Sequence, residues 1–150
     1  MAPAVSIVAT SAARTAVIRE TTTWERFPTL WSELLDEVWT YVRGAGVQAG
    51  RNVMLYLDDV PNVEVGVELE GDLAAPSGRI VAAALPEGRA ATTVARGAPS
   101  PQGIAAAHAA VIDWCDANGH VRTGVRWEIY DHWRDDPDSF ETAVYWLLAS

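Results

Sequence analysis

A glutamate stands in the middle of an apolar segment near the end of this 150-residue chain. In "VRWEIYD" the alternation of residue types predicts a strand with Arg126, Glu128 and Tyr130 on one face. A carboxylate that is partly removed from water needs hydrogen-bond donors or a counter-charge, and it attracts cations. Aromatic rings beside it would add cation–π attraction of roughly 0.5–2 kcal/mol each. The segment therefore predicts a cation-binding groove, and the alternative is an exposed glutamate paired with an arginine.

The elements that must position this glutamate occur twice along the chain. Each copy is predicted to contain two strands, one helix and two further strands. The first copy covers about 4–72, with strands at 4–9, 15–20, 51–59 and 63–71 and a helix at 27–46. The second covers about 78–149, with strands at 78–85, 89–97, 124–132 and 141–149 and a helix at 101–119. In both copies the last two strands form a hairpin.

The two copies align on a glycine and a tyrosine in the same strand. Gly50 and Tyr56 match Gly124 and Tyr130, and this register places Glu128 at the position of Met54. The carboxylate is thus a departure from the internal template. Because neither half would fill the groove between them alone, a ligand cleft is expected where the halves meet.

The predicted fold class is α+β, with one domain spanning 1–150. Two strand-strand-helix-strand-strand units would form one curved antiparallel sheet of about eight strands, related by a pseudo-twofold axis. Two main helices would cover it.

Several further side chains are candidates for the walls of the cleft. Trp31 and Trp39 lie eight residues apart on one face of the first helix, and His108 lies on the apolar side of the second. Each of them also fits a position in the core. The candidates from the repeat and from the helices are Glu128, Met54, Tyr56, Tyr130, Trp31, Trp39 and His108.

Composition narrows the classes of partner. The net charge of −9, with eleven arginines and no lysine, makes direct binding to nucleic acid improbable. His108, His120 and His132 lack metal-ligand spacing, so neither a metal nor another cofactor is expected. No segment is long and apolar enough for a membrane span, and a lone Cys115 forms no internal disulfide, so we expect a soluble, cytoplasmic protein. We expect it to be a monomer or a homodimer.

With these residues in place, the chain resembles the GyrI-like superfamily, which provides the effector-binding domain of AraC-type and MerR-type multidrug regulators. In the second copy the resemblance is carried by "ALPEGRAATTVARGAPSPQGIAAAHAAVIDWCDANGH", by Glu128 and Tyr130 as an E-x-Y motif, and by "ETAVYWLL". In the first copy it is carried by "TTTWERFPTLWSELLDEVWTYV" and "VMLYLDD". It covers nearly the whole chain and leaves no helix-turn-helix region, which predicts a stand-alone member.

This resemblance implies a pocket between the halves, with Glu128 at its base in contact with cationic ligands. It also implies an aromatic residue from the final strand, for which Tyr145 is the nearest candidate.

Three functions follow as hypotheses. The first is a binding protein that captures amphipathic, aromatic and often cationic compounds, either as a drug sink or as a sensor coupled to a regulatory protein. The second is a hydrolase that opens cyclopropane rings of DNA-alkylating natural products, in which Glu128 would handle a proton. The third is an inhibitor of DNA gyrase that acts through protein contact.

Overall fold

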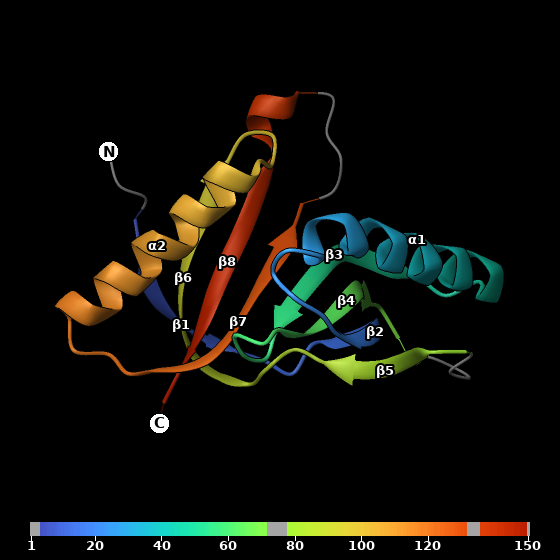
Figure 1. Ribbon diagram of the computed structural model, residues 1–150, viewed down its shortest axis with the longest axis horizontal. Helices are drawn as coiled ribbons and strands as arrows, with labels where there is room; N and C mark the ends of the chain where they lie inside the picture. Colours follow the sequence, from blue (N-terminus) through green and yellow to red (C-terminus); the bar gives the residue numbers. More distant parts are fainter. Residues whose placement is uncertain (1–3, 72–77, 132–135, 150) are drawn as a thin grey trace.

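The computed structural model describes residues 4–71, 78–131 and 136–149, so His132 lies outside the described part. These residues form eight strands and two α-helices (Figure 1). Along the chain the elements are β1 (Ser6–Thr10), β2 (Arg14–Thr21), α1 (Phe27–Ala45), β3 (Ala49–Tyr56), β4 (Asn62–Leu69), β5 (Ile80–Ala84), β6 (Gly88–Arg96), α2 (Pro101–Ala117), β7 (Arg122–Tyr130) and β8 (Glu141–Leu148), with a 3-10 helix at Pro137–Ser139 before β8. The predicted order of elements occurs twice.

The eight strands belong to one antiparallel sheet with the order β1-β6-β8-β7-β3-β4-β2-β5. The α+β class and the predicted hairpins β3–β4 and β7–β8 are confirmed. The first strand of each copy pairs with a strand of the other copy. β1 of the first copy pairs with β6 of the second, and β5 of the second copy pairs with β2 of the first. This exchange joins the two halves at both edges of the sheet.

Local sequence signals fix both helices. α1 has Pro28 in its first turn and is followed by the C-cap residue Gly46, whose φ of 67° lies in the left-handed region that suits glycine. At the start of α2 the Ser100 hydroxyl accepts a hydrogen bond from the Gly103 backbone N–H at 3.0 Å. Each helix buries one apolar stripe, which in α1 is Phe27, Leu34, Leu35, Val38 and Val42 and in α2 is Ala107, Val111 and Cys115.

The two helices cover different parts of one face of the sheet (Figure 1). α1 packs on β4 and β2, and α2 packs on β6 and β8. The central strands β3 and β7 lie between these two contact areas and pair with each other. The side chains that β3 and β7 turn toward the helices are therefore at the junction of the two copies.

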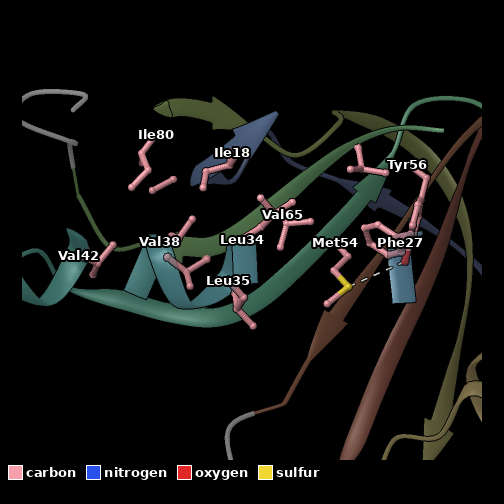
Figure 2. Close-up of a cluster of buried hydrophobic side chains, with 13 residues drawn as sticks. Ile18, Phe27, Leu34, Leu35, Val38, Val42, Met54, Tyr56, Val65 and Ile80 are labelled. Atoms are coloured by element: carbon pink, nitrogen blue, oxygen red, sulfur yellow. Dashed lines mark hydrogen bonds between the residues drawn. The ribbon is translucent and has the colours of Figure 1, made fainter. Parts of the chain in front are cut away.

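The core under α1 reaches this junction. Figure 2 shows Met54, Tyr56 and Phe27 together at one end of the buried cluster, next to the branched aliphatic side chains of α1, β2 and β4. The other face of the sheet has its own buried cluster, which includes Val17, Leu55 and Trp127. Neither α-helix in the described part of the chain combines the length and apolar character that a membrane crossing requires.

Candidate functional site

Three rows of directly paired residues cross the centre of the sheet on the face that carries the helices. From β3 through β7 to β8 the rows are Tyr56, Arg126 and Trp146; Met54, Glu128 and Val144; and Asn52, Tyr130 and Thr142. Directly paired residues share a face, so the predicted common face of Arg126, Glu128 and Tyr130 is confirmed. Met54 and Glu128, the counterparts in the two copies, pair with each other, and the pairing of β3 with β7 is symmetric about them.

Glu128 is buried and lies within hydrogen-bond distance of three side chains. Only 3% of the residue is exposed. The hydroxyls of Tyr56 and Tyr130 both donate to Oε1, at 3.0 and 2.6 Å. Nε2 of His108 lies 2.6 Å from Oε2. The two tyrosines that match in the repeat thus converge on the carboxylate that replaces Met54 of the first copy.

A tryptophan determines which nitrogen of His108 carries the proton. The indole Nε1–H of Trp146 donates to Nδ1 of His108 at 2.9 Å, so this nitrogen must be unprotonated. A neutral ring then carries its proton on Nε2 and donates it to Glu128. A charged ring would place an N–H group against the indole N–H. The packing therefore selects neutral His108 as the third donor to Glu128.

The electrostatics of this group favour neutral phenols around an ionised carboxylate. Glu128 accepts from three donors, which suits the charged, acceptor-only form. Burial raises the pKa of Tyr56 and of Tyr130 far above the usual value for tyrosine, and the charge and hydrogen bond of Glu128 raise both further. Neither phenol is therefore ionised near neutral pH.

This arrangement predicts a loss of stability at alkaline pH. The unfolded chain ionises Tyr56 and Tyr130 near pH 10 and the folded chain does not. The stabilisation that the two neutral phenols give the folded state is fully present below about pH 10. As pH rises from there toward the folded-state pKa values, the free energy of unfolding falls by about 1.4 kcal/mol per pH unit for each tyrosine. Urea unfolding between about pH 8 and 11 measures the decline. Tyr130→Phe should make it shallower, and an equally steep decline in this variant would contradict the assignment.

Beside Glu128, a guanidinium group is enclosed by aromatic rings. The Cζ atom of Arg126 lies 5.0, 5.4 and 5.8 Å from the ring centroids of Trp146, Trp24 and Tyr56. Tyr56 and Trp146 come from the paired positions on the neighbouring strands. Trp24 comes from the segment before α1, and its ring centroid is 5.5 Å from that of Tyr56. We call these three rings the aromatic cage.

A cavity of about 600 Å³ opens next to the cage. Arg126 and Trp146 line it, together with residues from the end of α2, from the start of β7 and from the β3–β4 turn. Its volume falls in the range of small-molecule pockets. Asp59 and Asp116 contribute carboxylates to its wall, and Arg122 contributes a second guanidinium group.

The helical tryptophans differ in their relation to the site. The indole of Trp39 donates to the side-chain oxygen of Asn52 at 2.8 Å, and Asn52 is paired with Tyr130. Trp39 therefore lies next to the third row. Trp31 is an exposed residue of α1.

Tyr145 lies on the opposite face of the sheet from Glu128. Its direct partner on β7 is Trp127, and their rings stack with centroids 5.2 Å apart. The two side chains line a separate cavity of about 400 Å³ on that face. The structure therefore brings Met54, Tyr56, Tyr130 and His108 to Glu128, but not Tyr145. The aromatic residue that β8 brings to the site is Trp146.

Three residues of the site were missed by the sequence analysis as ligand candidates, namely Trp24, Arg126 and Trp146. Arg126 was detectable, because strand alternation places it on the face of Glu128. Trp146 depends on the register between β7 and β8, and Trp24 depends on how the segment before α1 folds back. In the described part of the chain, no cluster of three or more histidine, cysteine or acidic side chains is suited to a metal ion.

A curved antiparallel sheet with two helices and a polar, aromatic group at the junction of two repeats defines a class of small-molecule-binding domain. The model of the GyrI-like small molecule binding domain matches residues 3–149, and the chain belongs to this family. The resemblance seen in the sequence is thus confirmed. No match was found among curated proteins.

Solved structures share the fold at low identity. The C-terminal domain of EcmrR has a TM-score of 0.81 at 18% identity, over 100% of this chain and 99% of that one. SAV2435 bound to tetraphenylphosphonium has a TM-score of 0.69 at 13% identity, over 98% and 94% of the chains. A hydrolase from Listeria innocua has a TM-score of 0.61 at 8% identity, over 99% and 93%. At these identities the likeness concerns the fold.

Proposed function

We propose that this protein binds aromatic, amphipathic organic cations at the centre of its sheet, with Glu128 supplying the negative charge. The observation that carries the proposal is the buried carboxylate of Glu128, whose three hydrogen-bond donors are two phenols and a neutral imidazole. Neutral donors hold the carboxylate in its ionised form without cancelling its charge. In surroundings of low polarity that charge acts strongly on a nearby cation.

The rings around the carboxylate suit the apolar part of such a ligand. Tyr56 belongs to the aromatic cage and also donates its hydroxyl to Glu128. Donation to a carboxylate makes the phenol ring more electron-rich, which strengthens its attraction for a cation. The adjoining cavity of about 600 Å³ supplies room for the remainder of the ligand. The likeness in fold to SAV2435, which was solved with tetraphenylphosphonium, supports this class of compound.

A comparison of a charged and a neutral aromatic compound tests the proposal. Tetraphenylphosphonium and triphenylphosphine oxide are titrated into the wild-type protein, with tryptophan fluorescence and calorimetry as readouts. We expect the cation to bind at least about tenfold more tightly, which corresponds to 1.4 kcal/mol. Equal affinities, or tighter binding of the neutral compound, would show that Glu128 does not select charge.

Hydrolysis is a second candidate, favoured by the close contacts within the same group. Glu128 lies 2.6 Å from both the Tyr130 hydroxyl and His108 Nε2, so a proton could move between these groups during a reaction. A carboxylate could orient water while a phenol protonates the leaving oxygen. Structures described as hydrolases share the fold at 7–8% identity.

Product mass distinguishes the two candidates. A cyclopropane-bearing alkylator is incubated with the protein and its mass is followed with time. Binding alone returns the compound unchanged, whereas hydrolysis adds the mass of one water. Hydrolysis that persists in Glu128→Gln at the wild-type rate would assign the reaction to another group.

A further inference from the structure

The aromatic cage already holds a cation that belongs to the protein. Arg126 is only 7% exposed, and its guanidinium group lies within 5.8 Å of the centroids of all three cage rings. An arginine over one ring is common, whereas enclosure by several aromatic rings is an arrangement with which proteins bind organic cations. The cage is therefore a cation site that is filled by an internal group.

The anchors that hold this guanidinium are few and lie toward solvent. One terminal nitrogen donates to the Gly124 carbonyl at 2.9 Å, and the other donates to Asp59 Oδ1 at 2.7 Å. The Asp59 side chain is 89% exposed, and ion pairs with exposed carboxylates contribute little. The Trp24 indole donates to the Asp59 backbone carbonyl at 3.0 Å, so the same turn positions one wall of the cage.

We propose that Arg126 is a resident occupant of the cation site, which an incoming organic cation displaces from the aromatic cage. This inference rests on the proposed function and identifies the subsite that receives the positive charge. The displaced guanidinium has a place to go, because the adjoining cavity is lined by Arg126 itself and by the carboxylate of Asp116. There it regains water and meets an acidic partner.

The exchange determines which cations bind. One positive charge replaces another next to Glu128, so the charge of the site is preserved. To bind, the ligand must gain more free energy from contact with the cage than the tethered guanidinium does. This gain must also exceed the free energy that the ligand loses when its own hydration shell is removed. Large cations with delocalised or shielded charge, such as phosphonium and quaternary ammonium compounds, meet this condition. Small, strongly hydrated ammonium ions do not.

Chemical modification of arginine gives a direct test of displacement. The wild-type protein is treated with phenylglyoxal, with and without saturating tetraphenylphosphonium, and the modified arginines are identified by peptide mass mapping. Ligands usually protect the residues that they contact. Here we expect the cation to increase the modification rate of Arg126 by about tenfold, because the state with the guanidinium group outside the aromatic cage becomes the populated one. An unchanged or reduced rate at Arg126, with the cation bound, would overturn the inference.

A pair of matched variants tests the competition. Arg126→Met keeps an unbranched side chain without charge, and we expect it to bind tetraphenylphosphonium about tenfold more tightly than wild type. The control is Arg79, an exposed arginine whose carboxylate partners are Glu20 and Glu37 and which does not line the cavity. Arg79→Met removes the same charge away from the site and should change the affinity by less than about twofold.

The outcomes separate this inference from the proposed function. If wild type binds the cation and Arg126→Met binds it equally or less tightly, the displacement is wrong and the proposed function stands. If neither protein binds it, both are wrong. Should Arg126→Met fail to fold, Asp59→Asn removes the outer anchor at an exposed position. It should increase both the affinity and the phenylglyoxal reactivity of Arg126 by about threefold, and no change in either would overturn the inference.

Discussion

Glu128→Gln is expected to weaken the binding of tetraphenylphosphonium by about 30-fold or more, which corresponds to about 2 kcal/mol. The substitution removes the negative charge of the site. It also disturbs the group around it, because a glutamine amide N–H cannot accept the proton that His108 Nε2 donates. The imidazole cannot simply move that proton to Nδ1, since Nδ1 accepts from Trp146. Calorimetric titration of both proteins measures the difference.

Two controls show whether this loss belongs to the charge at that position. The neutral triphenylphosphine oxide should lose less than about threefold in affinity for the Glu128→Gln protein, because its binding does not depend on the field of a carboxylate. Glu64 is also a buried glutamate on a strand, but its partner is Arg19 and it pairs with Leu55 on the opposite face. Glu64→Gln should alter cation binding by less than about twofold. Equal losses for both compounds would make Glu128 a structural residue.

Gly66→Ala is expected to destabilise the protein by at least about 3 kcal/mol. Gly66 lies on β4 between β2 and β3, and a methyl group there would lie 1.8 Å from the Ala16 carbonyl oxygen. The atoms in the way belong to the backbone of β2, so no side-chain rotation relieves the clash. The strands would have to separate and break the ladder beneath α1. Urea unfolding should show a much lower midpoint.

A second glycine provides the matched control. Gly44 lies inside α1, and apart from the adjacent backbone of the helix itself a methyl group there would meet nothing within 4 Å. Alanine restricts the unfolded chain more than glycine does, so Gly44→Ala should stabilise the protein by about 0.5–1 kcal/mol. Similar destabilisation by both substitutions would indicate that the cost at Gly66 comes from the loss of glycine rather than from the contact with β2.

Much of the architecture could be predicted from the sequence because the signals are local. Residues three and four apart define α1, and Pro28 and Gly46 mark its ends. Alternation on β7 places Arg126, Glu128 and Tyr130 on one face. The internal repeat identifies Met54 as the counterpart of Glu128, and the structure pairs these two residues at the centre of the sheet. The pairing of β1 with β6 and of β5 with β2 could not be predicted from local signals, because each pair joins strands of different copies.

The sequence by itself therefore determined the repeat, the antiparallel sheet and the glutamate that breaks the repeat. Only the tertiary structure decided what surrounds Glu128. A shift of one residue in the register of β8 exchanges Tyr145 for Trp146 on the helix face, and no local pattern sets that register. Trp24 and His108 reach the centre through the path of a loop and the packing of α2. The donors, the tautomer of His108 and the cage around Arg126 all depend on contacts between segments that are distant in sequence, and such contacts leave no periodic signal in the chain.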